Sequence, residues 1–403
     1  MKEQKKRNKK RQKQKVIKAP PAWIMAIGTF FVLPWLILKY KMAIDRSGIR
    51  DLKGPCLVLA PHTSNNDHLI LGTTLWRARP TFVLSEHFMK KPLTRFFLGL
   101  MNVITKKMFC ADAHTIMSIL RAKASGRVIV LFPEGRLPAN GHSVPVTAGT
   151  ADLVKKLGIP VYVLVANGAY LTFPKWAKYP RRGKIQVTSQ KLFDGEELNG
   201  LPVEEVSRRI DAAILHNDEL AMAGVTYRCR DMTAGLNGIL RRCPKCLKNG
   251  TLTTKDGHIR CTCGLDATLD HQYVLHDAPF TRIYEWYDWQ VSKIDPLTEA
   301  MECEVDVASV DEKDNLVKGA GSGRIRMDKD YISFAGEVFG EGIAFRVPTL
   351  QVGGLPVTVA EHFDLYHNNK LYTFFPKEDP CQVIDWVAYL ERYHDLQKEE
   401  EVN

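Results

Sequence analysis

The stretch Cys56-Leu57-Val58-Leu59-Ala60 leads directly into Pro61-His62-Thr63-Ser64-Asn65-Asn66-Asp67. Further along the chain, Val128-Ile129-Val130-Leu131 leads in the same way into Phe132-Pro133-Glu134-Gly135-Arg136. Short apolar runs of this kind are typical of buried strands in a parallel sheet. Ligands of open α/β sheets bind outside the carboxyl ends of the strands. The two polar clusters are therefore predicted to form one site.

The first cluster contains a His and an Asp that suit acid–base chemistry. Asp67 follows His62 with four residues between them. A carboxylate bound to an imidazole fixes the ring's tautomer and stabilises the cation that forms when the ring takes a proton. His62 is therefore predicted to be a general base, with Asp67 as its orienting partner. The structural alternative is a plain helix start, because Asn and Asp are good helix caps.

Together the two clusters resemble the signature of the glycerolipid acyltransferases, of the lysophosphatidate acyltransferase type. The resemblance rests on His62-x4-Asp67 and Phe132-Pro133-Glu134-Gly135, and it covers residues 45–215. It implies that His62 deprotonates a glycerolipid hydroxyl, which then attacks the thioester of an acyl-CoA or an acyl carrier protein. It implies no acyl-enzyme, and no nucleophile-elbow pattern surrounds His62.

The resemblance also implies which residues bind the substrate. Glu134, Gly135 and Arg136 would bind the glycerol and its phosphate, with Glu134 as a binder rather than a second base. Lys106, helped by Lys107, stands where the family carries an Arg, and a Lys lacks the bidentate fork of a guanidinium. The family's commonest form also has a Thr before the Arg that here directly follows Gly135. These departures leave the head group of the acceptor open. A structural role for Glu134, as a helix cap or as the partner of a buried Arg, is the alternative.

Three further features have weaker patterns. Gly158-Ile159-Pro160-Val161 resembles the last block of the family, which shapes the acyl pocket, although an ordinary helix-to-strand turn has the same residues. Arg181 and Arg182 are expected to lie in solvent. His68, next to Asp67, is expected on the surface of a helix.

Apolar runs and helical patterns alternate over residues 41–225. Strand–helix alternation predicts a layered α/β acyltransferase domain with a mostly parallel sheet. Strands are expected at 56–60, 81–84, 128–131, 161–165 and 184–188, and helices at 67–77, 113–124, 149–157 and 203–216.

A basic arm and an apolar segment precede this domain. Ten Lys or Arg fall within residues 1–18 against a single Glu, and the chain has a net charge of +11. Such an arm attracts anionic lipid, at roughly 1 kcal/mol for each basic residue near the surface. Residues 22–38 are apolar apart from Thr29, yet 17 residues is the lower limit for a membrane span. Residues 1–40 are therefore predicted to be an arm and an in-plane or re-entrant membrane anchor, with a single span as the alternative.

Five of the nine cysteines lie between Cys229 and Cys263, a clustering that favours a metal site in a reducing compartment over disulfides. Cys243 and Cys246 form one knuckle, and Cys261 and Cys263 form another. Four thiolates suit a structural Zn²⁺ without an open coordination position. Because the second knuckle is C-x-C, Cys229, His258 or His271 could replace one ligand. A zinc ribbon is predicted over residues 226–275.

Residues 276–403 are predicted to form a β-rich C-terminal module. Alternating strands are expected at 302–307, 322–327, 331–335, 343–347 and 370–375. Residues 382–396 have the pattern of an amphipathic helix, which would close the module.

The sequence thus predicts an enzyme at the cytoplasmic face of a membrane. It would transfer an acyl chain from acyl-CoA or acyl carrier protein to a lysophospholipid, with 1-acylglycerol 3-phosphate as the expected acceptor, and it would use no catalytic cofactor. One alternative is the same chemistry on another glycerol-phosphate acceptor. The other is a non-catalytic protein whose zinc ribbon binds nucleic acid or a protein, although an aromatic–basic interleave typical of nucleic-acid binding is missing around the knuckles.

Overall fold

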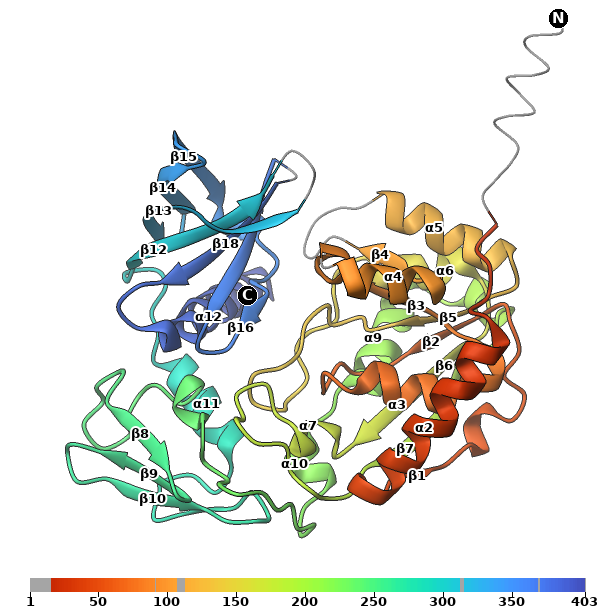
Figure 1. Cartoon of the computed structure of the whole chain (residues 1–403), viewed down its shortest axis with the longest axis horizontal. Helices are drawn as coiled ribbons and strands as arrows, with labels where there is room; N and C mark the ends of the chain where they lie inside the picture. Colours follow the sequence, from red (N-terminus) through yellow and green to blue (C-terminus); the bar gives the residue numbers. More distant parts are fainter. Residues whose placement is uncertain (1–15, 91, 107–112, 312–314, 369, 403) are drawn as a thin grey trace, which may run out of the picture. The chain divides into compact units, whose positions relative to one another are not determined.

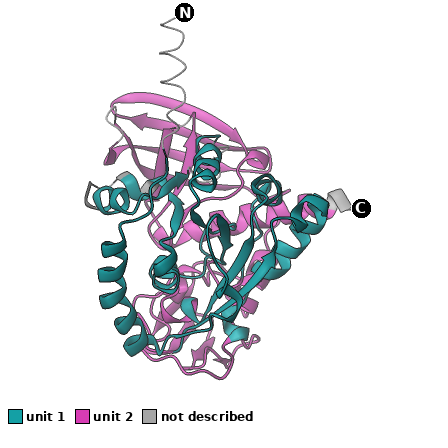
Figure 2. Ribbon diagram, turned by 90° about the vertical axis from the view of Figure 1, so that its right-hand side faces the viewer, with its two compact units in different colours: residues 1–137, 143–169, 184–221 teal, residues 138–142, 170–183, 222–403 magenta. Residues whose placement is uncertain are grey.

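The computed structural model describes residues 16–90, 92–106, 113–311, 315–368 and 370–402 (Figure 1). The chain forms two compact units, which Figure 2 colours separately. Unit 1 comprises residues 1–137, 143–169 and 184–221, and unit 2 comprises residues 138–142, 170–183 and 222–403. Both predicted polar clusters belong to unit 1.

Unit 1 is built on a seven-stranded sheet with the order β1-β7-β6-β2-β5-β3-β4. All neighbours pair in parallel except β6 and β7, which are antiparallel. The mostly parallel α/β sheet expected from the sequence is thereby confirmed. The strands are β1 (Ala43–Ile44), β2 (Cys56–Leu59), β3 (Thr81–Ser85), β4 (Ile104–Lys106), β5 (Val128–Leu131), β6 (Val161–Asn167) and β7 (Gln186–Phe193).

Helices cover both faces of this sheet. The α-helices of unit 1 are α2 (Ala22–Tyr40), α3 (Asp67–Thr74), α4 (Pro92–Leu100), α5 (Ala113–Ala124), α6 (Thr150–Leu157), α8 (Glu197–Gly200), α9 (Val203–Ile214) and α10 (Asp218–Ala221). Short 3-10 turns are η1 (Ser47–Ile49), η2 (Trp76–Ala78) and η3 (Glu86–Lys90). The four-residue helix α7 (Ala169–Thr172) lies where the chain passes from unit 1 to unit 2.

Successive residues of β2 point to opposite faces of the sheet, as the pleat requires. Leu57 and Leu59 join a core with α5, α6 and α9. Cys56 and Val58 join a second core with α3. Because β2 is buried on both faces, it has no polar alternation, and this is why its sequence is a continuous apolar run.

Helix α2 packs onto the globular part of unit 1. Leu36 and Tyr40 are buried in one cluster with Ile70 of α3 and Val187 of β7. The opposite side of α2 exposes large apolar side chains: Trp23, Ile27, Phe30, Phe31, Trp35, Ile37 and Leu38. Among the described residues, α2 is the one helix that is long and apolar enough to cross a membrane.

Unit 2 contains a small four-stranded antiparallel sheet of order β11-β10-β9-β8. It consists of β8 (Leu252–Lys255), β9 (His258–Cys261), β10 (Asp266–Leu269) and β11 (Leu275–His276), with η4 (Leu236–Gly238) before it and α11 (Ile283–Ser292) after it. This sheet lies in the cysteine-rich segment, where a ribbon was predicted.

The C-terminal module is a second seven-stranded sheet, entirely antiparallel, of order β15-β14-β13-β12-β18-β17-β16. The predicted β-rich module with a closing helix is thereby confirmed. Trp386 of the closing helix stacks on Phe363 of the sheet, with the ring centroids 5.0 Å apart. The elements are β12 (Met301–Val310), β13 (Leu316–Met327), β14 (Tyr331–Val338), β15 (Glu341–Pro348), η5 (Thr349–Gln351), β16 (Val357–Thr358), β17 (His362–His367), β18 (Lys370–Pro376), η6 (Pro380–Gln382) and α12 (Val383–Val402).

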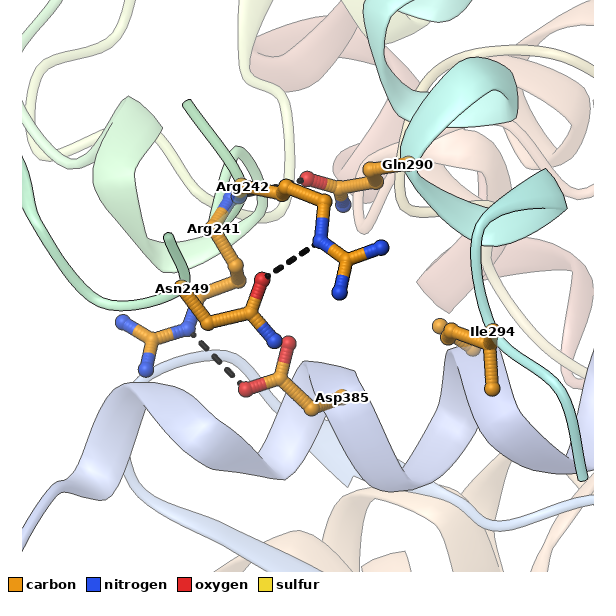
Figure 3. A pocket seen from close by; sticks show the side chains of 7 residues that line it. Arg241, Arg242, Asn249, Gln290, Ile294 and Asp385 are labelled. Atoms are coloured by element: carbon orange, nitrogen blue, oxygen red, sulfur yellow. Dashed lines mark hydrogen bonds and ion pairs between the residues drawn. The ribbon is translucent and has the colours of Figure 1, made fainter. Parts of the chain in front are cut away.

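A small pocket lies inside unit 2 (Figure 3). Arg241 holds Asp385 there through Nε, at 3.2 Å, and also pairs with Asp379. The volume of the pocket, about 20 Å³, suits a water molecule rather than a substrate. The pocket is lined by Arg241, Arg242, Asn249, Gln290, Ile294, Asp385 and Ala388.

Candidate active site and metal centre

His62 and Asp67 form a hydrogen-bonded pair at the carboxyl end of β2. The Nδ1 atom of His62 lies 2.9 Å from Oδ2 of Asp67. The same carboxylate oxygen accepts the backbone N–H groups of Thr63 at 2.8 Å and Ser64 at 2.9 Å. Asp67 is buried as the first residue of α3, whereas 18% of the His62 side chain is exposed. Asp67 therefore both orients the imidazole and holds the loop that carries it.

Glu134 joins the second cluster to the first. Its Oε2 accepts the backbone N–H of His62 at 2.5 Å, and its Oε1 accepts the backbone N–H of Val144 at 3.0 Å. Only 2% of Glu134 is exposed. Burial raises the pKa of this carboxyl group to about 8, against the two N–H bonds, which favour the ionised form. Glu134 holds the backbone of His62 in place.

Aromatic rings surround the imidazole of His62. The ring of Phe132 stacks on it, with the centroids 4.5 Å apart, and the ring of His68 lies edge-on at 5.7 Å. His68 itself packs against Phe82, at 5.6 Å. Burial, together with the nearby charge of His62, lowers the pKa of His68 to about 3. The expectation that His68 lies on a helix surface is wrong, because α3 turns this residue towards the Phe82 and Phe132 rings.

The predicted phosphate-binding residues stand at the same edge of the sheet. Gly135 has a φ of +74°, a left-handed conformation that favours glycine and turns the chain after Glu134. Arg136 follows this turn and is half-buried. Lys106 ends β4, where it is the register partner of Ser85 in β3. Lys107 lies outside the described residues.

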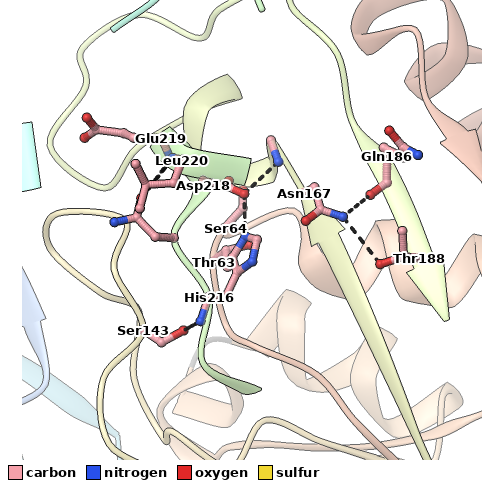
Figure 4. A network of polar contacts seen from close by, with 12 residues as sticks. Thr63, Ser64, Ser143, Asn167, Gln186, Thr188, His216, Asp218, Glu219 and Leu220 are labelled. Atoms are coloured by element: carbon pink, nitrogen blue, oxygen red, sulfur yellow. Dashed lines mark hydrogen bonds and ion pairs between the residues drawn. The ribbon is translucent and has the colours of Figure 1, made fainter. Parts of the chain in front are cut away.

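A second His–Asp pair supports the segment that holds Glu134. Ser143, the residue before Val144, donates its N–H to the carbonyl of His216 at 2.8 Å, and its hydroxyl accepts the N–H of His216 at 2.8 Å. Nε2 of His216 lies 2.6 Å from Oδ1 of the fully buried Asp218. The backbone N–H of Gly168 donates to the same oxygen at 2.7 Å. Figure 4 draws these residues in one polar network with the loop of Thr63 and Ser64.

The sequence did not indicate this second pair. His216 ends an ordinary amphipathic helix pattern, and Ser143 lies in a loop without periodicity. The one available signal was the His-x-Asp spacing of residues 216 and 218, which is common by chance.

Two weaker expectations have different outcomes. Gly158, Ile159 and Pro160 form the turn between α6 and β6, with Ile159 buried, and nothing distinguishes this turn from an ordinary helix-to-strand connection. Arg181, expected in solvent, is fully buried in unit 2. Its guanidinium lies over the Trp176 ring at 4.7 Å and donates to the carbonyl of Met232.

The four cysteines of the two knuckles come together in unit 2. The Sγ atoms of Cys243 and Cys263 are 3.6 Å apart, and those of Cys246 and Cys261 are 3.8 Å apart. All four sulfur atoms lie within 4.8 Å of one another, so the cluster could hold a metal ion. These separations are far from the S–S length of about 2 Å in a disulfide.

Two of the three alternative ligands considered for the second knuckle, His258 and Cys229, are engaged elsewhere. Nδ1 of His258 lies 2.6 Å from Oδ1 of Asp266. The thiol of Cys229 lies against the carbonyl of Asp231 and the sulfur of Met232. The C-x-C knuckle therefore supplies both of its cysteines to the cluster.

Comparison with known proteins finds similarity over residues 41–166. Residues 41–166 match the family model described as Acyltransferase. Among solved structures, the chain is similar to the 1-acyl-sn-glycerophosphate (LPA) acyltransferase PlsC from Thermotoga maritima, with 18% sequence identity and a TM-score of 0.38, over 47% of this chain and 79% of that chain. The match agrees with the family resemblance noted from the two motifs, and residues 41–166 of this chain form an acyltransferase domain.

Proposed function

We propose that this protein transfers an acyl chain from acyl-CoA or an acyl carrier protein to the free hydroxyl of a lysophospholipid, with 1-acylglycerol 3-phosphate as the principal acceptor. One observation carries the proposal. The imidazole of His62 is bound to Asp67 while its backbone is bound to Glu134, so both motifs of the acyltransferase domain meet at one residue.

The geometry supports a role for His62 as the general base. With Nδ1 donating to Asp67, Nε2 carries the lone pair that can accept a proton. Nε2 would take the proton of the acceptor hydroxyl as its oxygen attacks the thioester carbonyl. The C–S bond then breaks, and the departing thiolate receives the proton from the imidazolium. Asp67 stabilises the cation in the interval.

Binding of the acceptor phosphate is assigned to Arg136 and Lys106. Arg136 follows the Gly135 turn at the end of β5, and Lys106 ends β4. Both therefore stand at the carboxyl edge of the sheet, where ligands of such folds bind. A glycerol 3-phosphate acceptor would use the same cations, so the head group is the part of the proposal that needs a direct assay.

Helix α2 is assigned as an in-plane membrane anchor at the cytoplasmic face. The carbonyl of Pro20, just before α2, accepts Nε of Arg79 at 2.8 Å. The carbonyl of Tyr40, at its other end, accepts the N–H of Ile185 at 3.0 Å. A 19-residue helix is about 28 Å long, so a spanning helix would carry one end across the bilayer and away from the domain. Contacts at both ends favour a helix that lies along the domain.

The cysteine cluster is assigned to a structural Zn²⁺. Tetrahedral coordination with Zn–S bonds of about 2.3 Å separates the sulfur atoms by about 3.8 Å, close to the 3.6 and 3.8 Å found here. Four protein ligands leave no open position, so the metal would contribute to the folding of unit 2 rather than to the chemistry.

The direct test is mass spectrometry of lipids after the purified full-length chain is incubated with mixed lysolipids and glycerol 3-phosphate, with acyl-CoA or acyl carrier protein as donor. We expect 1-acylglycerol 3-phosphate to be consumed and a diacyl product to form. Acyl transfer to glycerol 3-phosphate alone would reassign the acceptor. The absence of any acylated product with either donor would refute the proposal.

A further inference from the structure

Residues 87–109 combine aromatic and basic side chains without a single acidic one. The segment contains five cations and four Phe residues: Lys90, Lys91, Arg95, Lys106 and Lys107, and Phe88, Phe96, Phe97 and Phe109. A segment that combines apolar rings with charged residues of positive sign only is typical of peptides that lie in the interface of an anionic bilayer.

The structure exposes the apolar part of this segment. The exposed fractions are 63% for Phe96 and 56% for Phe97 in α4, and 47% for Phe88 in η3. Leu100, at the end of α4, is also exposed. Single exposed apolar residues are common on soluble proteins, but these four lie within one short segment of thirteen residues. We call Phe88, Phe96, Phe97 and Leu100 the α4 surface.

The segment after α4 contacts the segment before α2. Nδ2 of Asn102, two residues after α4, donates to the carbonyl of Ala19 at 3.5 Å, just before α2 begins. Arg79 binds the neighbouring carbonyl of Pro20. In Figure 1, α2 and α4 both lie on the side of unit 1 that faces the viewer. The side chain of Asn102 thus links the residue after α4 to the segment before α2, where the nearby Trp23 is exposed.

The α4 surface also borders the catalytic edge. Strand β3 ends at Ser85 and leads directly into η3 and α4. Its carboxyl end lies at the same edge of the parallel sheet as the ends of β2 and β5, which carry His62 and Glu134. A membrane in contact with α4 would therefore adjoin the site that receives the lipid.

From these observations we propose that the α4 surface is a second membrane contact, whose partner is an anionic bilayer surface. Phe96 and Phe97 enter the interface, and Arg95 faces the anionic head groups. With α2 as the first contact, two contacts fix the orientation of unit 1, so that a lysophospholipid reaches His62 from the bilayer. The role in lipid delivery rests on the proposed acyltransferase function, whereas the membrane contact itself does not.

The test measures binding of the full-length chain to vesicles of phosphatidylcholine and phosphatidylglycerol, without acyl donor or acceptor. For the double variant Phe96→Ser/Phe97→Ser we expect binding to weaken about tenfold, because two rings no longer leave water, with residual binding through α2. Phe96→Leu/Phe97→Leu should retain most of the binding. Arg95→Gln should weaken binding roughly fivefold at low salt and less at high salt.

A matched control uses Ile116 and Met117 on α5, which are exposed to 40% and 46%. Helix α5 packs on the face of the sheet opposite α3, so Ile116→Ser/Met117→Ser should bind vesicles like the unchanged chain. Melting curves of all variants establish that unit 1 is folded.

The outcomes separate the two proposals. Equal vesicle binding by the folded Phe96→Ser/Phe97→Ser variant and the unchanged chain would overturn the α4 contact and leave the acyltransferase proposal intact. About tenfold weaker binding by this variant, in a chain that transfers no acyl group, would support the contact and refute the enzyme. Absence of vesicle binding by the unchanged chain, with self-association that the substitutions abolish, would assign the α4 surface to a protein partner and overturn the membrane proposal.

Discussion

The backbone N–H of His62 donates to the carboxylate of Glu134 across 2.5 Å, although 72 residues separate them in the chain. This bond ties the loop after β2 to the loop after β5. Glu134 thereby acts on the imidazole through the backbone, and its two carboxylate oxygens are both occupied by N–H groups. In this structure Glu134 positions the backbone of His62, and its binding of the acceptor stays a prediction.

The pH dependence of stability should report the buried Glu134. Burial raises the pKa of its carboxyl group from 4.5 to about 8, so between these values the folded state holds a proton that the unfolded state releases. The contribution of Glu134 to stability is therefore full below about pH 4.5 and is lost as the pH rises through 8. Relative to Glu134→Gln, the unfolding free energy should fall by up to about 1.4 kcal/mol for each pH unit in this window. Hydrogen exchange of the amides in β2 and β5 measures this unfolding free energy. If the difference in unfolding free energy between the unchanged chain and Glu134→Gln did not vary with pH, the raised pKa of Glu134 would be contradicted.

Asp67→Asn should lower kcat far more than it changes KM. The substitution removes the negative charge that stabilises the imidazolium of His62, and an Asn can bind the ring in the wrong tautomer. We expect a fall in kcat on the order of 10²- to 10⁴-fold. Steady-state kinetics with a lysophospholipid acceptor is the measurement. Unchanged kcat in a folded Asp67→Asn variant would rule out the pair as the catalytic base.

Ser143→Ala should loosen the support of Glu134. The hydroxyl of Ser143 donates to the carbonyl of Ile214 at 3.0 Å and accepts the N–H of His216. Its loss leaves the His216 N–H without that acceptor, at a cost of about 1–3 kcal/mol of unfolding free energy. If the network positions Glu134, kcat/KM should fall as well, and Ser143→Thr should restore part of it. Ser207→Ala, which removes an exposed bond to Asp211, is the control and should change neither quantity.

Removal of the metal should affect unit 2. The purified chain should contain one zinc, and a strong chelator should expose Cys243, Cys246, Cys261 and Cys263 to alkylation and loosen the ribbon. Cys246→Ser should lose the metal, whereas Cys229→Ser should keep it, because the Cys229 thiol bonds to the Asp231 carbonyl instead. Native mass spectrometry measures the number of zinc ions bound to each chain. A metal-free chain with four freely reactive thiols would refute the site.

The parts of the fold that follow from local pattern were predictable. Strands β2 and β5 are apolar runs because both faces of the sheet are covered, and the polar clusters had to meet at the carboxyl edge. The antiparallel direction of β7 could not be predicted, since strand direction depends on how the chain returns to the sheet. Strand β17 was missed because Asp364 interrupts its apolar pattern. That Asp is buried and satisfied by the hydroxyl of Thr373, at 2.6 Å, a contact which only the folded sheet creates.

The residues of the candidate site also include some that could be predicted from the sequence and some that could not. His62 and Asp67 were identifiable from their spacing and chemistry, and Glu134 from the resemblance to the acyltransferase family. Outside the site, the sequence analysis overlooked helix α11. Its buried residues nevertheless have helical spacing: Ile283, Trp286, Tyr287 and Gln290. The support of Glu134 by Ser143 and His216 depends on two loops meeting in space, for which a single sequence holds no signal.

The most direct test of the central claim compares His62→Ala with the unchanged full-length chain in acyl transfer to 1-acylglycerol 3-phosphate, with product measured by mass spectrometry. His114→Ala is the control, because His114 lies exposed on α5. We predict that His62→Ala loses activity by at least about 10²-fold while it still melts as a folded protein and binds vesicles, and that His114→Ala stays fully active. Undiminished acyl transfer by His62→Ala would contradict the account.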